Sequence, residues 1–311
     1  MPDTKPMRCL IFVLFLLTST RCIAANAIDS LQTDKDVEAF ANHVVGKFLG
    51  AKHLNARVLP TASIYQNAKC DSVAKQWNGK NWQKADFNSD GKTDLLVILY
   101  FDCRSFRSYV ITDVGSQGFK AHNLNREFPN DCELAKIVTI NQQPALLYYY
   151  VKMEATNLPL VYRSHLQIDA LIYKYGGFVE YNRNPRHVEI KAIDLETFGS
   201  WSESPAFKLN VRRNGHAVYK PTGFATNQKT EAGKITAEKL EEITALLGYI
   251  NIRQLKDSYA VNWTDDQTVD LKITFADGSA KTIHDYGLKG TFGLSHLYNV
   301  LFYLRRSESW K

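Results

Sequence analysis

Long hydrophobic runs are scarce in this chain of 311 residues. One apolar run, Cys9–Leu17, has nine residues, whereas a membrane-spanning helix needs about 20. We find no second stretch of spanning length and expect no transmembrane segment after this run. Like charges do not cluster either. The 38 basic and 32 acidic residues are intermixed, with no run of five, which argues against nucleic acid as a partner.

Catalytic motifs are also missing. The sequence contains no G-x-S-x-G, H-E-x-x-H, G-x-x-x-x-G-K-[ST] or G-x-G-x-x-G, the patterns of common hydrolases, zinc proteases and nucleotide-binding sites. No C-x-x-C occurs, so neither a thioredoxin-like motif nor a zinc ribbon is supported. No catalytic residue can be assigned from the sequence, and we expect a protein that is not an enzyme.

The N-terminus has the pattern of a signal peptide. Lys5 and Arg8 precede the short apolar run, and Ala25-Asn26-Ala27 follows it. A basic start, a short apolar core and a small-x-small site predict secretory cleavage after Ala27. An uncleaved anchor is the alternative. We therefore expect residues 1–27 to be a signal peptide and the protein to be periplasmic or secreted.

Cysteine placement bears on the same question. Cys22 follows Arg21 rather than a small residue, which disfavours lipid attachment. Cleavage would leave Cys70, Cys103 and Cys132. An oxidising compartment favours one disulfide among the three, and the sequence leaves its pairing open. Free or buried thiols are the alternative.

The first part of the mature chain reads as a helix followed by strands. From Thr33, apolar residues recur at helical spacing as far as Leu49, and Gly50 suits the helix end. Residues 82–180 then read as short, mainly antiparallel strands, among them the continuous apolar run Leu95–Phe101. We expect an N-terminal α+β domain over residues 28–180.

A polar stretch containing Pro185, residues 181–187, reads as a linker. After it the pattern restarts with strands, two Asx-Gly hairpins and two amphipathic helices, one from Thr236 and one over residues 294–304. The predicted fold class is α+β: two mainly antiparallel α+β domains, the second over residues 188–311.

One segment carries recognisable chemistry. Oxygen-bearing side chains recur at Asp86, Asn88, Asp90 and Asp94, with Gly91 at the sixth position. A hard cation such as Ca²⁺ takes six to eight oxygen ligands. We predict a structural calcium site made by these four side chains and by the carbonyl of Lys92. An Asx-rich hairpin without metal is the alternative.

The loop resembles a known family. Residues 85–97 are similar to the calcium loop of integrin-type FG-GAP repeats, which implies that the loop joins two strands. Those repeats usually recur to build a propeller, whereas the motif occurs once here.

The C-terminal half resembles an uncharacterised bacterial family of domains of unknown function. The matching segments are Ile193–Thr197, the Asn214-Gly215 hairpin, Leu255–Tyr259, Thr264-Asp265 and Ile283–Gly287. That family usually carries Cys-x-Gly-x-Cys-Pro before its first hairpin. The corresponding residues here, 200–205, lack cysteine.

These observations lead to one preferred function and two alternatives. We expect an exported, non-enzymatic binding or structural protein with a calcium-stabilised loop, whose partner is an unidentified protein or envelope component. The first alternative is a hydrolase of envelope polymers with an unrecognised site near Asp257, Asp265 and His284. The second is an inhibitor or immunity-type partner of a secreted enzyme.

Overall fold

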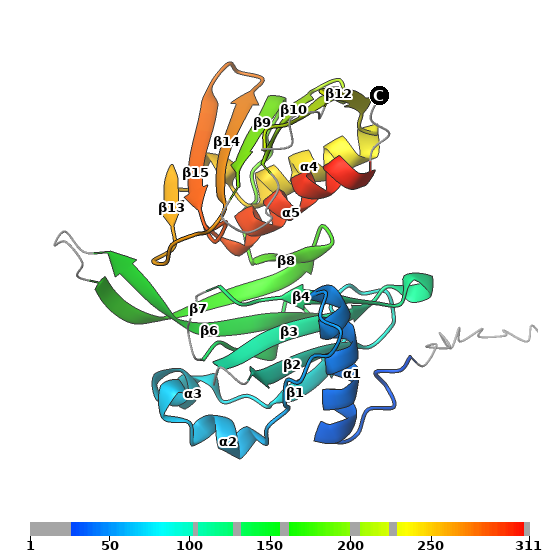
Figure 1. The fold of residues 1–311 in the computed structure, drawn as a ribbon, viewed down its shortest axis with the longest axis vertical. Helices are drawn as coiled ribbons and strands as arrows, with labels where there is room; N and C mark the ends of the chain where they lie inside the picture. Colours follow the sequence, from blue (N-terminus) through cyan, green and yellow to red (C-terminus); the bar gives the residue numbers. More distant parts are fainter. Residues whose placement is uncertain are drawn as a thin grey trace, which may run out of the picture.

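The computed structural model describes residues 26–101, 105–126, 132–155, 162–199, 206–223 and 229–307. The predicted signal peptide lies outside the described residues except for its last two. The described residues form three β-sheets and five α-helices, arranged as in Figure 1. Within this part of the chain, no helix has the length and apolar character needed to cross a membrane.

The first sheet follows an N-terminal helix. Helix α1 spans Asp34–Phe48 and begins at the N-cap Thr33, as predicted. The sheet has four antiparallel strands in sequence order: β1 (Trp82–Ala85), β2 (Asp94–Phe101), β3 (Ser105–Asp113) and β4 (Phe119–Asn123). Helix α1 covers one face, because Leu95, Val97 and Leu99 of β2 pack with its apolar stripe.

The second sheet packs against the other face of the first. Its four antiparallel strands are β5 (Leu134–Ile140), β6 (Gln143–Ala155), β7 (Tyr162–Lys174) and β8 (Gly177–Glu180). Leu96 of β2 packs with Leu146 and Tyr148 of β6. Strand β2 is therefore buried on both faces, which explains its continuous apolar run. Two short helices, α2 (Thr61–Tyr65) and α3 (Asp71–Trp77), lie before β1.

The third sheet has seven strands. In spatial order they are β12 (Glu231–Lys234), β11 (His216–Pro221), β10 (Phe207–Arg212), β9 (Ile190–Phe198), β14 (Thr268–Phe275), β15 (Ala280–Tyr286) and β13 (Ser258–Ala260). Only the β13–β15 pair is parallel among the described strands. Helices α4 (Ala237–Tyr249) and α5 (Phe292–Ser307) cover one face.

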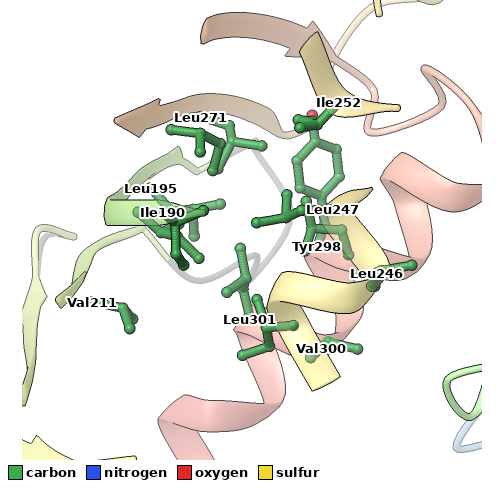
Figure 2. Close-up of a cluster of buried hydrophobic side chains, with 14 of the residues drawn as sticks. Ile190, Leu195, Val211, Leu246, Leu247, Ile252, Leu271, Tyr298, Val300 and Leu301 are labelled. Atoms are coloured by element: carbon green, nitrogen blue, oxygen red, sulfur yellow. The ribbon is translucent and has the colours of Figure 1, made fainter. Parts of the chain in front are cut away.

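One large apolar cluster joins this sheet to its helices. Figure 2 shows Leu195 and Leu271 from the sheet together with Leu247 of α4 and Leu301 of α5. All four side chains are buried. Their burial follows from the strand alternation and helical spacing that the sequence displays.

Helix α5 also contacts the second sheet and lies between β8 and the seven-stranded sheet (Figure 1). Both carboxylate oxygens of Glu180, at the end of β8, accept hydrogen bonds from the first amides of α5, those of Phe292 (2.6 Å) and Gly293 (2.9 Å). A Cβ on Gly177 would lie 2.4 Å from Nδ1 of His296, so only glycine fits there without movement.

The predicted linker, residues 181–187, lies between β8 and β9. It is held against the end of α4 by hydrogen bonds from the Asn182 amide to the Tyr249 hydroxyl (2.9 Å) and from the Arg186 amide to the Gly248 carbonyl (3.2 Å). Independent folding of the parts on either side stays a prediction.

The predicted fold class, α+β, is wrong. The described residues are 42% strand and 25% helix, with three sheets, and the fold is closer to all-β. The division into two domains stays a prediction. The periodicities that predicted helices α1, α4 and α5 are confirmed. The error comes from the strands. Strands β6 and β7 each extend over 13 residues and form a second sheet with β5 and β8, and local patterns do not show how strands divide into sheets.

Candidate functional site

The predicted calcium loop is a hairpin connection between β1 and β2, as the sequence indicated. Ala85 pairs with Asp94 at its base. Gly91 has a φ of 83°, the left-handed conformation that favours glycine, and Ser89 also has a positive φ of 58°. These two residues turn the chain tightly between the strands.

The side chains of the loop are aimed at its own backbone amides. Asp86 accepts hydrogen bonds from the amides of Asp90 (3.2 Å) and Gly91 (2.9 Å). Asn88 accepts from the Asp90 amide (3.1 Å), and Asp90 accepts from the Lys92 amide (2.9 Å). The structure therefore brings Asp86, Asn88 and Asp90 together into one network.

Asp94 is the buried member of the predicted ligand set. Its side chain is fully buried and accepts from the amides of Phe87 (2.9 Å) and Asp113 (3.0 Å). Burial raises the pKa of Asp94 to about 7, and the carboxylates of Asp90 and Asp86 add to the rise against the effect of these two hydrogen bonds. Asp94 makes no ion pair with any described residue.

Lys92, predicted to contribute its carbonyl, also has a role for its side chain. Its ammonium lies 3.1 Å from the carboxylate of Asp113, which itself accepts from the Gly115 amide (2.7 Å). Burial opposes the ionisation of Asp113, but these hydrogen bonds and the Lys92 charge lower its pKa. Sequence reasoning missed Asp113, because it lies on β3 and nothing in the sequence connects it to the loop.

The oxygen atoms of the loop are the kind of ligand that a hard cation prefers, but their present arrangement does not form a site for one. Four side chains with a carboxylate or amide group lie within nine residues, and a buried carboxylate without a counter-charge is costly. However, no group of three or more His, Cys, Asp or Glu side chains among the described residues is placed to hold a metal ion. Calcium binding would require the carboxylates of Asp86 and Asp90 to exchange amide partners for the ion.

One disulfide joins two segments before and after the loop. Cys70 and Cys132 are bonded, with their Cα atoms 5.2 Å apart and a sequence separation of 62 residues. Both are buried. The bond links Cys70, just before α3, to Cys132, two residues before β5. The sequence left this pairing open, since proximity of the two cysteines depends on the fold. Cys103 lies outside the described residues.

The residues of the hydrolase alternative have separate partners. The Asp257 carboxylate pairs with Lys281, and His284 Nδ1 lies 2.6 Å from Asp270. Asp265 accepts from the Thr264 hydroxyl at 3.2 Å. The backbones of Asp257 and His284 are joined by a hydrogen bond of 2.9 Å, but the side chains of the three residues share no interaction.

The part of the chain that forms the seven-stranded sheet is similar to a known protein family. Residues 191–305 match the model of a family described as Domain of unknown function (DUF6438). The match begins in β9 and ends in α5, so it includes the sheet and both covering helices. This confirms the predicted resemblance of the C-terminal half. No curated protein and no solved structure matches the chain.

The DUF6438 region contains Asp257, Asp265 and His284 but not the calcium loop. The comparisons give no support to a relation between residues 85–97 and FG-GAP repeats. Residues 200–205, where the sequence lacks the expected cysteines, lie outside the described residues.

Proposed function

We propose that this chain is an exported binding or structural protein without catalytic activity, periplasmic or secreted. The Cys70–Cys132 disulfide is the observation that carries export, because such bonds persist in oxidising compartments and are rare in reducing ones. The signal-peptide pattern of residues 1–27 agrees with it. The separate pairing of Asp257, Asp265 and His284 favours a binding role over hydrolysis.

We also infer that the loop of Asp86, Asn88, Asp90, Lys92 and Asp94 binds one structural Ca²⁺. The support is the accumulation of negative charge around a buried carboxylate, with Asp86 and Asp90 in the same loop as Asp94. When bound, the ion would neutralise the mutual repulsion of the three carboxylates. The loop connects directly to β2, at the centre of the N-terminal part, so binding would stabilise that part.

Thermal unfolding in calcium and in chelator tests this proposal. Saturating calcium stabilises by RT ln(1 + [L]/Kd), which is about 2.7 kcal/mol at a hundredfold excess over Kd. We expect the unfolding transition of the N-terminal part to rise by several degrees in millimolar calcium. Asp90→Ala should abolish the difference between calcium and chelator.

Asp277→Ala is the matched control, since Asp277-Gly278 forms an Asp-Gly hairpin turn in the DUF6438 region and pairs with Arg253. This variant should respond to calcium like the wild type. Equal melting of the wild type in calcium and in chelator, with no heat of calcium binding, would show that the loop is only a turn.

A further inference from the structure

A cavity lies where the second sheet meets the DUF6438 region. Its volume is about 370 Å³, within the range of small-molecule sites. Strands β6 and β7 and the end of β8 form one side, and the end of α4 with the loop before α5 forms the other. Most of its walls are aromatic or hydrogen-bonding side chains, among them Tyr150, Gln167, Tyr181, Asn182, Tyr249 and Thr291.

Arg126 is the unusual residue of this cavity. It is only 6% exposed. Its guanidinium donates a hydrogen bond to the Lys289 carbonyl and lies 4.5 Å over the ring of Phe292. It forms no ion pair with any described residue. The charge of Arg126 acts on the buried carboxylate of Asp285 and favours its ionisation. The hydrogen bond to the Lys289 carbonyl uses only part of the five N–H donors of the guanidinium. Arg126 therefore has donors left for an anion in the cavity.

The other charges of the cavity limit the charge of that anion. Lys152 is a second cation in the wall, and Asp169 and Glu180 are carboxylates. Glu180 already accepts the first two free amides of α5, so the start of this helix offers no anion site. Two carboxylates in the same wall oppose a doubly charged ligand. The two cations and the two carboxylates of the wall cancel. A ligand with a single negative charge, placed at Arg126, is therefore favoured over a doubly charged one.

Asp169 is held in place within the wall. Its carboxylate accepts from the Tyr150 hydroxyl (3.1 Å) and from Nε2 of Gln167 (2.8 Å). The Thr291 hydroxyl accepts from the Leu294 amide (3.0 Å) and keeps its own proton for a ligand, so the cavity offers both donors and acceptors to ligand hydroxyls. Aromatic rings among them suit the apolar face of a sugar ring.

We propose that this cavity binds a sugar acid, a hydroxylated ring with one carboxylate, and that the carboxylate pairs with Arg126. The planar guanidinium matches a carboxylate in a two-bonded geometry that an ammonium cannot reproduce. The inference rests on the binding role proposed above and is independent of the calcium loop.

Titration calorimetry of the whole protein tests the proposal with four defined probes. Glucuronate and galacturonate carry one carboxylate, glucose carries no charge, and glucose 6-phosphate carries two charges near neutral pH. At least one uronate should bind at a single site with millimolar affinity or better. Glucose and glucose 6-phosphate should each bind about tenfold more weakly or worse, a difference of about 1.4 kcal/mol.

Two variants locate the site. Arg126→Lys keeps the positive charge but loses the planar guanidinium that can donate two parallel hydrogen bonds to a carboxylate. It should weaken uronate binding at least about tenfold. Arg107→Lys is the matched control, because Arg107 also lies over an aromatic ring, that of Phe101 at 5.2 Å, but outside the cavity. If Arg126→Lys does not fold, Gln167→Ala, in the β7 part of the wall, should still reduce uronate affinity in a folded protein.

The absence of uronate binding by the wild type would overturn the proposal. So would equal affinity for glucose, tighter binding of glucose 6-phosphate, or uronate binding that is unchanged in both Arg126→Lys and Gln167→Ala. None of these outcomes affects the calcium test, since that test measures unfolding in the absence of sugars.

Discussion

Residues 28–180 divide their buried side chains among three apolar clusters, whereas residues 188–307 gather nearly all of theirs into one. Only a few cross between the parts, such as Val179 in the large cluster and Phe292 in a small one. Smaller cores contribute less hydrophobic stabilisation and are commonly supplemented by cross-links. The difference explains why the disulfide and the predicted ion site both belong to the N-terminal part.

Removal of the disulfide should give the largest change in stability among the tests of this comparison. Cys70→Ala with Cys132→Ala should lower the free energy of unfolding by about 4 kcal/mol, the loop-closure value for 62 residues. Urea unfolding should show the loss in the N-terminal part. A double variant as stable as the wild type would contradict the role given to the cross-link.

A substitution that creates a cavity in the large apolar cluster should give the next largest loss of stability. Leu301→Ala removes a fully buried side chain from the core shown in Figure 2 and should cost about 3 kcal/mol. Tyr303→Ala, on the same helix but 62% exposed, should cost about 0.5 kcal/mol or less. Chemical denaturation measures both. Similar losses in the two variants would show that the cluster is not the main source of stability there.

Acid should destabilise the packing of β4 against the second sheet, where the His122 ring contacts Tyr173 and Phe178. Burial, together with the charges of Lys120 and His296, lowers the pKa of His122 to about 3. The unfolded chain protonates near its ordinary pKa of about 6.5. Stability is therefore present above about pH 6.5 and is lost as the pH falls toward 3, by about 2 kcal/mol at pH 5.

His122→Gln should remove most of that pH dependence, because glutamine can still bond to Thr112, whose hydroxyl lies 3.1 Å from His122 Nε2. His284→Gln is the control, since the His284 side chain is 55% exposed. The free energy of unfolding of both proteins is measured between pH 5 and 8. If it falls equally with pH in His122→Gln and in the wild type, His122 is not the source of the pH dependence.

Helix caps provide the smallest test. Thr33 and Asp36 cap α1 reciprocally, through hydrogen bonds of 3.2 Å and 2.9 Å, whereas Thr236 caps α4 through one bond of 3.2 Å to the Lys239 amide. Thr33→Ala should cost about 1 kcal/mol and Thr236→Ala about 0.5 kcal/mol. Thr→Ser at each position should restore the stability. A larger loss at Thr236 would contradict this ranking.

The sequence predicted local features well, and features that depend on distant contacts poorly. Thr33, Leu95–Phe101 and the turn at Gly91 were found because capping, burial and turn formation leave marks within a few residues. The partition of strands into three sheets, the pairing of Cys70 with Cys132 and the approach of Asp113 to Asp94 leave no such marks. Each depends on segments brought together by the fold.

For the candidate site, the sequence identified the loop and its side chains but not how they are used. It could not show that Asp94 would be buried against Phe87 and Asp113, because burial depends on β3 and the second sheet. The cavity around Arg126 gave no sequence signal, since its walls come from segments more than 100 residues apart.

The capping of α5 by Glu180 decides how the protein can be divided for further work. A fragment cut at the borders of the family match, residues 191–305, would contain α5 but not the carboxylate that accepts its first amides. Such a fragment should fray at that helix start even if its sheet folds. Beginning the fragment at Gly177 instead would include the whole of β8 and keep Glu180 with the helix.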